Sequence, residues 1–232
     1  MDLYKFHSNP ETLHGYDRAD EIVPERIYDI AKSGKKLTNK QEDIIAKDPE
    51  YAYEYALNVL KKPWPKGEDA IAKNIKYAYY YARDVLNKPW PKGEDVIIKD
   101  VSSIYYYSLN VLKNPWPKAE DIIAKDIIFA YLYARDILNK PWPKAEEVIA
   151  KDAQYSYYYT RDILKKPFPK GEDVISKDPE YSYWYAYAVL KKPFPKGEDV
   201  ISKDSYWAYI YACKILKLPE AEARRWPNNG SL

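Results

Sequence analysis

One 26-residue unit recurs along most of this chain of 232 residues. Each copy carries a pair of acidic residues, and the seven copies follow one another from residue 42 to residue 223 without insertion or deletion. We number the positions of a copy 1 to 26 from the first acidic residue, which is Glu42, Glu68, Glu94, Glu120, Glu146, Glu172 or Glu198. A unit this short cannot bury its own apolar side chains. The repeat therefore predicts copies stacked into an elongated solenoid.

The sequence of each copy predicts two helices. The first runs from position 24 of the preceding copy to position 6, because proline suits the first helical turn and acidic residues suit the positive end of the helix dipole. Position 7 is Asp in six copies and Asn74 in the other, and both are good N-caps for a second helix over about positions 8 to 20. The following Lys-Pro-Trp-Pro segment ends this helix, since proline disfavours helix in the residue before it.

The residue pattern of the second helix predicts how the copies pack. At about 100° per residue, positions 11, 15, 18 and 19 share one face, with small residues at 11 and 15, Val or Ile at 18 and Leu at 19. Tyrosines at positions 12 and 14 are expected to flank this buried stripe with their hydroxyls reaching water or a polar partner. The aromatic residue at position 23, Trp or Phe in six copies, is expected to fill the gap between consecutive copies.

The two flanks predict caps, which the exposed ends of a stack need. Residues 1–41 are expected to form an N-terminal capping segment, in which residues 16–34 resemble a decayed copy that ends at Gly34. Residues 42–223 are the seven repeats. A closing helix is expected from Pro219 to Trp226, and residues 224–232 contain the end of this C-terminal cap and a tail. The predicted fold class is all-α: a right-handed or superhelical α-solenoid of seven helix-turn-helix repeats with caps at both ends.

Charge and cysteine content limit the function classes. The 37 basic and 35 acidic residues give a net charge of +2, without the strong basic excess of a dedicated duplex-DNA binder, although a local basic strip stays compatible with these numbers. Cys213 is the single cysteine, so no intrachain disulfide forms, which fits a cytoplasmic protein. No apolar stretch has the length of a signal peptide or a membrane span, so we expect no membrane partner.

The sequence offers little for catalysis. His7 and His14 precede the repeats and, with one distant cysteine, are too few for a zinc site. No glycine-rich phosphate loop or nucleophile-elbow motif is present. The acidic pairs recur in every copy at a helix N-terminus, where they serve the dipole and the cap, whereas a catalytic pair is needed once. We therefore predict a protein that is not an enzyme and has no catalytic residue, no metal and no cofactor.

Positions 13 and 16 vary between copies and supply the candidate binding residues. On the helical wheel they lie beside each other and point away from the buried stripe. Large aromatic residues and arginines stand there, and such residues are enriched at binding hot spots. The candidates are Tyr80, Tyr106, Tyr158 and Trp184 at position 13, and Arg83, Arg135, Arg161 and Tyr187 at position 16. The alternative is that position 13 packs within the chain, under the first helix of a neighbouring copy, and both interpretations stay open at this stage.

Two functions fit these residues. The first is a scaffold that binds a protein partner, because a curved stack presents one different side chain per copy at fixed spacing. The alternative is single-stranded nucleic acid or nucleotide binding, with aromatic rings stacking on bases and the arginines meeting phosphates. Against the alternative, an acidic residue follows each of the three arginines: Asp84, Asp136 and Asp162.

The unit from Asp48 to Lys73 resembles short α-solenoid repeats of the HEAT and leucine-rich-repeat-variant kind. It is more similar still to Tyr-rich tandem repeats of hypothetical bacteriophage and bacterial proteins. The resemblance covers about four fifths of the chain and concerns architecture far more than activity. It implies a phage-encoded protein in the host cytoplasm that binds or inhibits a host protein.

Overall fold

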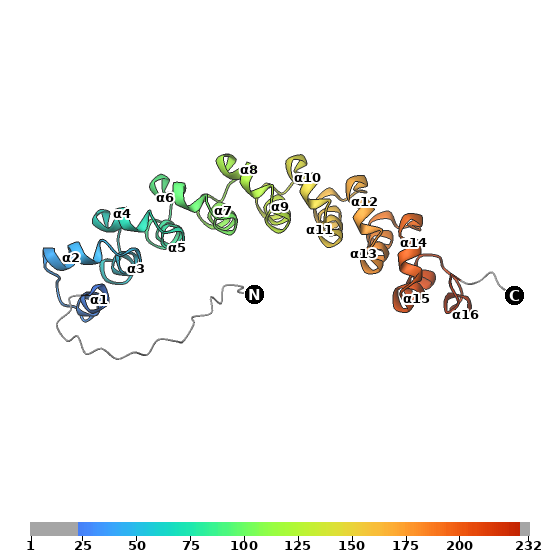
Figure 1. Cartoon of the computed structure of the whole chain (residues 1–232), viewed down its shortest axis with the longest axis horizontal. Coiled ribbons are helices and arrows are strands. Elements are labelled where there is room, and N and C mark those ends of the chain that lie inside the picture. Colours follow the sequence, from blue (N-terminus) through green and yellow to red (C-terminus); the bar gives the residue numbers. More distant parts are fainter. Residues whose placement is uncertain (1–22, 228–232) are drawn as a thin grey trace.

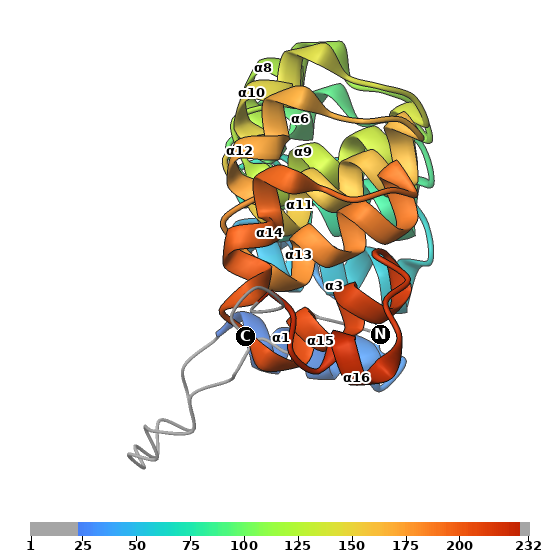
Figure 2. The ribbon, with the colours of Figure 1, turned by 90° about the vertical axis from the view of Figure 1, so that its right-hand side faces the viewer.

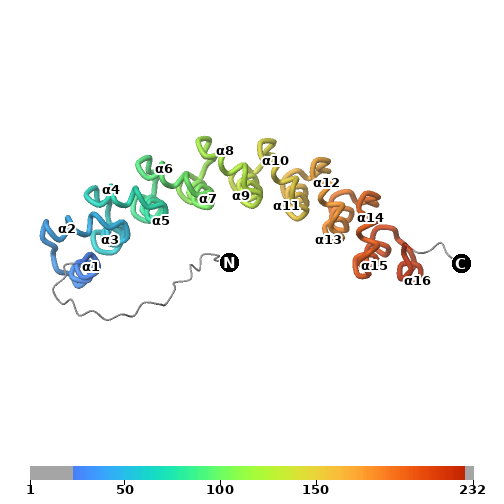
Figure 3. The backbone as a smooth tube through the Cα atoms, in the orientation of Figure 1, coloured from blue at the N-terminus to red at the C-terminus, as the bar shows by residue number. Residues whose placement is uncertain are grey.

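The described part of the chain, residues 23–227 of a computed structural model, is an arc of stacked helices (Figure 1). No strand occurs within these residues. The backbone trace in Figure 3 shows that each copy places its first helix on the outer, convex side of the arc and its second helix on the inner, concave side. The predicted all-α solenoid is confirmed.

The first helices are short, and from the second copy onward each begins at the proline of position 24, directly or through a 3₁₀ turn. Their bounds are α2 (Asn39–Ile45), α4 (Glu68–Ile71), α6 (Pro91–Ile97), α8 (Glu120–Ile123), α10 (Pro143–Ile149), α12 (Pro169–Ile175) and α14 (Pro195–Ser202). The 3₁₀ turns Pro65–Gly67 and Pro117–Ala119 precede α4 and α8. Helix α2 lacks this proline and starts instead with a capping box, in which Thr38 and Gln41 bind each other's backbone N–H.

The second helices begin at the predicted N-cap. The carboxylate of Asp152 accepts the N–H of Tyr155 at 2.9 Å, and the amide oxygen of Asn74 accepts the N–H of Tyr77 at 3.2 Å. The α-helical parts are α3 (Pro49–Glu54), α5 (Ile75–Tyr80), α7 (Val101–Tyr107), α9 (Ile127–Tyr133), α11 (Ala153–Tyr159), α13 (Pro179–Trp184) and α15 (Ser205–Lys214).

Six of the second helices widen into π-helix before they end. These segments are Tyr55–Leu60, Tyr81–Leu86, Ser108–Leu112, Ala134–Leu138, Thr160–Leu164 and Tyr185–Leu190. A π-helix bonds residue i to i+5 and so turns less per residue than the α-helix assumed by the helical wheel. The leucine of position 19 is consequently only half-buried at the edge of the core, as Leu138 is, and position 18 is half-buried in six of the seven copies. The predicted stripe is confirmed as buried at positions 11 and 15 and was wrong in placing positions 18 and 19 fully inside.

The tyrosines of position 14, and not the leucines, form the centre of the core. Six of the seven have no exposed surface, so the expectation that they flank the core was wrong, while their hydroxyls reach polar partners, which was one of the two expected outcomes. The ring of Tyr133 packs on Trp142 of its own copy at 5.1 Å, while its hydroxyl accepts the N–H of Trp116 of the preceding copy. A satisfied hydroxyl allows a tyrosine to be buried completely. Five of these tyrosines join two connectors and two copies in this way: Tyr81, Tyr107, Tyr133, Tyr159 and Tyr185.

The aromatic residue of position 23 fills the gap between copies, as predicted. Trp90 is 6% exposed and lies against the start of the following first helix. A Cβ atom on Gly93 would come within 2.4 Å of the Trp90 ring. Close approach of the indole to the backbone therefore explains why position 26 holds glycine, or alanine as the largest residue.

Both ends of the stack are closed by short helices. At the N-terminal end, α1 (Pro24–Lys32) buries Ile27 and Ala31 and is followed by Gly34 with a positive φ of 87°. The earlier residues of the predicted decayed copy, 16–22, lie outside the described part. At the C-terminal end, α16 (Glu220–Ala223) is shorter than the predicted closing helix. There Trp226 packs on Tyr211 at 5.4 Å and replaces the position-23 aromatic residue that this copy lacks.

Candidate interaction surface on the concave face

The concave face of the arc is formed by the second helices (Figure 1). Their positions 11, 14 and 15 are buried toward the first helices, so positions 13 and 16 point toward the inside of the arc. The structure places all eight candidate residues there. Tyr80, Tyr106, Tyr158 and Trp184 are half-buried, and Arg83, Arg135, Arg161 and Tyr187 are exposed. We call positions 12, 13, 16 and 17 of the seven copies the concave surface.

The side chains of position 13 pack against neighbouring second helices. The ring of Tyr158 lies 5.9 Å from Tyr131 of the preceding copy and 6.3 Å from Tyr181 of the following copy. Its hydroxyl accepts a hydrogen bond from Gln154 at 3.0 Å. Position 13 thus contributes to the contact between copies and still presents part of its surface to the inside of the arc.

The arginines of position 16 are held by the aspartates that follow them. Arg135 donates from Nε and Nη2 to the two carboxylate oxygens of Asp136, at 2.6 and 2.8 Å. Its guanidinium also lies 5.1 Å from the ring of Tyr131. The hydroxyl of Tyr105, from the preceding copy, donates to Asp136 at 2.6 Å. The same aspartate therefore ties the arginine down and links two copies.

This Tyr–Asp–Arg arrangement recurs along the concave surface. Asp84 and Asp162 bind Arg83 and Arg161 in the same bidentate way. They also accept the hydroxyls of Tyr53 and Tyr131 from the preceding copies, at 2.9 and 2.6 Å. Where position 17 is Asn110, the amide donates to the Tyr79 hydroxyl at 2.8 Å instead. Sequence reasoning noticed the aspartates beside the arginines but missed that they contact tyrosines one copy away.

The electrostatics of the arrangement favour its charged form. Burial alone would raise the pKa of Asp136, but hydrogen bonds from Arg135 and Tyr105 outweigh it and hold this pKa below its usual value. Burial, together with the hydrogen bond to Asp162, raises the pKa of Tyr131 to about 12. At neutral pH the carboxylates are ionised acceptors, and the tyrosines are protonated donors.

The Tyr–Asp–Arg arrangement ends at the sixth copy, because position 17 there is Ala188. The last two copies carry aromatic residues on this part of the concave surface instead. Tyr183 and Tyr187 stack at 5.7 Å, and Trp184 lies 6.3 Å from Trp207 of the seventh copy. Tyr187 is 49% exposed, and the adjoining Tyr206 is 62% exposed. We call these five residues the C-terminal aromatic cluster: Tyr183, Trp184, Tyr187, Tyr206 and Trp207. Tyr206 and Trp207 were missed as candidates, although an aromatic residue at position 10 of six copies was a signal for Trp207.

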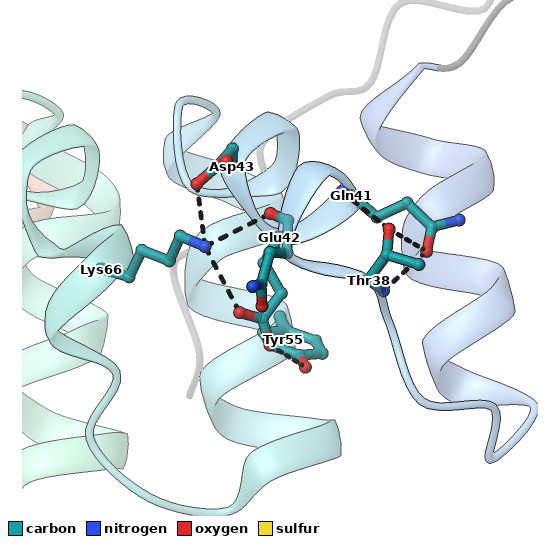
Figure 4. A network of polar contacts seen from close by, with 7 residues as sticks. Thr38, Gln41, Glu42, Asp43, Tyr55 and Lys66 are labelled. Atoms are coloured by element: carbon teal, nitrogen blue, oxygen red, sulfur yellow. Dashed lines mark hydrogen bonds and ion pairs between the residues drawn. The ribbon is translucent and has the colours of Figure 1, made fainter.

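The acidic pairs lie on the convex side and link first helices of consecutive copies (Figure 4). Lys66, at the start of the second copy's first helix, binds Asp43 at 2.8 Å and Glu42 at 3.4 Å, and Glu42 also accepts the Tyr55 hydroxyl. Equivalent lysines bind acidic pairs further along the stack. The N-cap residues of α4 and the later first helices are Gly, Ala, Trp or Phe and make no side-chain cap hydrogen bond, and acidic residues stand in the first turn of each helix. The predicted position of the acidic residues at the positive end of the dipole is therefore confirmed, and their predicted capping role was wrong.

The described residues contain no group of three or more His, Cys, Asp and Glu side chains placed to hold a metal ion. His7 and His14 lie outside the described part of the chain. Cys213 is half-buried at position 16 of the last copy. Among residues 23–227, every helix is too short or too polar to cross a bilayer.

No protein-family model matches this chain, and neither a curated protein nor a solved structure matches it.

Proposed function

We propose that this chain is a non-catalytic repeat scaffold that binds a protein partner along its concave surface. The observation that carries the proposal is the C-terminal aromatic cluster. It places exposed Tyr187 and Tyr206 beside half-buried Trp184 and Trp207 on a rigid pair of helices. Aromatic side chains that are already held by their neighbours lose little conformational freedom on binding, and they are the common anchors of protein interfaces.

The Tyr–Asp–Arg arrangement supports the same function along the rest of the concave surface. Each arginine is fixed by a bidentate ion pair but keeps two fifths or more of its side-chain surface exposed, as with Arg161 at 45%. Planar groups fixed in this way offer hydrogen bonds and ring stacking without a large loss of entropy. The second, fourth and fifth copies thus supply polar, specific contacts, and the last two copies supply aromatic anchors.

Single-stranded nucleic acid or nucleotide binding is the weaker alternative. The arginines that would meet phosphates each have a carboxylate at 2.6 Å, so a phosphate would have to approach an acidic residue. The ion pairs therefore favour a protein partner over a polyanion on the concave surface. With the phage origin that the repeat resemblance implies, the partner would be a bacterial host protein in the cytoplasm.

A capture experiment with matched surface variants tests the proposal. Wild-type protein, a Trp184→Ala variant and an Ile122→Ala variant are used as baits in bacterial lysate, with and without nuclease treatment. Trp184 also packs on Tyr183 and Trp207, so circular dichroism first verifies that its variant is folded. Ile122 is a 41% exposed apolar residue on the convex helix α8, so it controls for loss of exposed apolar surface. We expect one protein to be retained by wild type and Ile122→Ala and lost from Trp184→Ala. Equal retention by all three baits, or loss of all binding after nuclease treatment, would contradict the proposal.

A further inference from the structure

The connectors between copies carry a row of lysines at positions 20 and 21. Every copy has at least one, although neither position is lysine throughout. All ten are exposed: Lys61, Lys62, Lys88, Lys113, Lys140, Lys165, Lys166, Lys191, Lys192 and Lys217. We call these residues the connector lysines. They follow the ends of the second helices, and Figure 2 shows that the connectors of successive copies lie along the same side of the arc.

The connector lysines differ from the lysines of position 25 in their partners. The lysines of position 25, which stand at the start of the next first helix, bind the acidic pair of their own copy, as Lys92 does with Asp69 at 2.7 Å. None of the connector lysines forms an ion pair with an acidic side chain of the described residues. The nearby aspartates of position 17 are held by arginines, as Asp162 is by Arg161. Most lysines of position 6, such as Lys99, also form no ion pair within the described part of the chain, but the Asp or Asn N-cap of position 7 follows each of them directly. Positions 20 to 23 of the first six copies contain no acidic residue, so positive charge without an acidic neighbour in sequence gathers along the connectors.

Backbone conformation argues that these lysines serve more than the fold. Position 20 has a positive φ in every copy, for example 53° at Lys61 and 54° at Lys191. Glycine or asparagine adopts this conformation at lower cost than lysine. Asparagine does occupy it in two copies, at Asn87 and Asn139, where φ is 48°. Five copies nevertheless have lysine there, and in the two with asparagine the next residue is lysine.

We propose that the connector lysines form a flat electrostatic docking edge for an anionic lipid bilayer surface. The reason is geometric as well as electrostatic. Because the connectors lie on one side of the plane of the arc, a flat anionic surface can meet all seven copies at once. The concave surface opens within the plane of the arc, so it would stay accessible to a protein partner. This contact is peripheral, so it needs no membrane-spanning segment, and it departs from the expectation of no membrane partner that rested on the absence of such a segment. It is independent of the proposed protein-binding function.

Nucleic acid fits the edge less well than a bilayer. A straight duplex touches a curved row over only part of its length. A flexible single strand can follow the curve, but its binding normally draws on exposed aromatic rings for base stacking. The aromatic residues of these connectors are buried: Trp64 is 8% exposed and Trp142 is 6% exposed. The connectors expose lysines but neither arginines nor aromatic rings. Polybasic segments that are attracted to acidic lipids have clustered basic residues of this kind.

Vesicle flotation tests the proposal. The wild-type chain is mixed with vesicles of phosphatidylcholine alone or with about one third phosphatidylserine. The test variant replaces the five lysines of position 20: Lys61→Asn, Lys113→Asn, Lys165→Asn, Lys191→Asn and Lys217→Asn. Asparagine already occupies this position in two copies, so the variant keeps the fold, which circular dichroism verifies. The charge-matched control replaces five exposed lysines at the opposite ends of the second helices: Lys47→Gln, Lys99→Gln, Lys125→Gln, Lys151→Gln and Lys177→Gln.

We expect wild type to bind the anionic vesicles and not the neutral ones, with binding that weakens as salt is added. Each lysine near such a surface contributes about a fivefold gain in affinity, so the position-20 variant should bind more than about tenfold more weakly. The control should keep most of its binding. Absence of wild-type binding, or equal weakening of both variants, would overturn the proposal. So would binding of DNA or RNA with the same dependence on position 20 but no binding to vesicles, and that result would assign the edge to nucleic acid.

Discussion

The hydroxyl of Tyr133 accepts the backbone N–H of Trp116, seventeen residues earlier in the chain, at 2.6 Å. Tyr133 has no exposed surface and Trp116 is 6% exposed, so water cannot replace this acceptor. Tyr133→Phe should leave a buried N–H without a partner and lower the free energy of unfolding by about 1–3 kcal/mol. Chemical denaturation measures this loss. Tyr206→Phe, at an exposed tyrosine, is the control and should change stability by less than about 0.5 kcal/mol.

The position of a copy in the stack should decide how far the loss of stability spreads when one of its buried side chains is truncated. Ile123 and Ile201 occupy position 4 of the fourth and seventh copies, and both are completely buried. Ile123→Ala should lower the free energy of unfolding of the whole stack by about 2–5 kcal/mol. Ile201→Ala should mainly release the last copy, because a terminal copy has one repeat neighbour and can unfold by itself. Hydrogen exchange distinguishes the two, and equal loss of protection along the chain in both variants would contradict the nearest-neighbour stack.

Alkaline pH should unfold the protein through its buried tyrosines. Burial raises the pKa of Tyr131 and Tyr159 to about 12, above the value of about 10 for an exposed tyrosine. A raised pKa in the folded state means that stability is fully present below pH 10 and is lost as pH rises toward 12. Tyrosinate absorbance and circular dichroism, followed together, should show these tyrosines ionising with loss of helix. Their ionisation at pH 10 with the helices intact would contradict the prediction.

Removal of a concave arginine should affect binding more than folding. Arg161 is 45% exposed and pairs with Asp162, and exposed ion pairs contribute about 0.2–1 kcal/mol to stability. Arg161→Ala should therefore lower the melting temperature only slightly and weaken binding of the proposed protein partner by about 1–3 kcal/mol. Calorimetry measures both quantities. Arg26→Ala, outside the repeats on α1, is the comparison for loss of one arginine and should leave partner affinity unchanged.

A comparison of an aromatic residue of position 13 with one of position 16 should separate packing between copies from partner binding. Tyr158 contacts rings of both neighbouring copies, whereas Tyr187 of position 16 is 49% exposed. Tyr158→Ala should therefore cost stability as well as partner binding. Tyr187→Ala should weaken binding with little effect on the melting temperature. If both variants lowered stability by several kcal/mol without changing affinity, the concave surface would be a packing face alone, and the proposed interface would be wrong.

The sequence by itself determined the repeat, the two helices of each copy, their N-caps and the filling of the gaps by Trp90 and its equivalents. These features depend on residues close to each other in the chain, so local rules suffice for them. It also predicted that positions 13 and 16 point away from the buried stripe, although it left open whether position 13 is covered by a neighbouring first helix. Position 13 precedes or borders the π-helical turns, and position 16 lies only one or two residues after they begin, so the α-helical wheel is still a fair guide there.

Tertiary structure alone decided which residues form the core and how the charges are compensated. The wheel placed Leu138 inside and Tyr133 at the edge, whereas the π-helical turn moves the leucine outward, and a backbone N–H from the preceding copy satisfies the tyrosine hydroxyl. The bond from Tyr105 to Asp136 spans 31 residues, and no local pattern indicates such a partner. Whether a polar group can be buried depends on a partner supplied by the neighbouring copy, and that partner exists only once the copies have stacked.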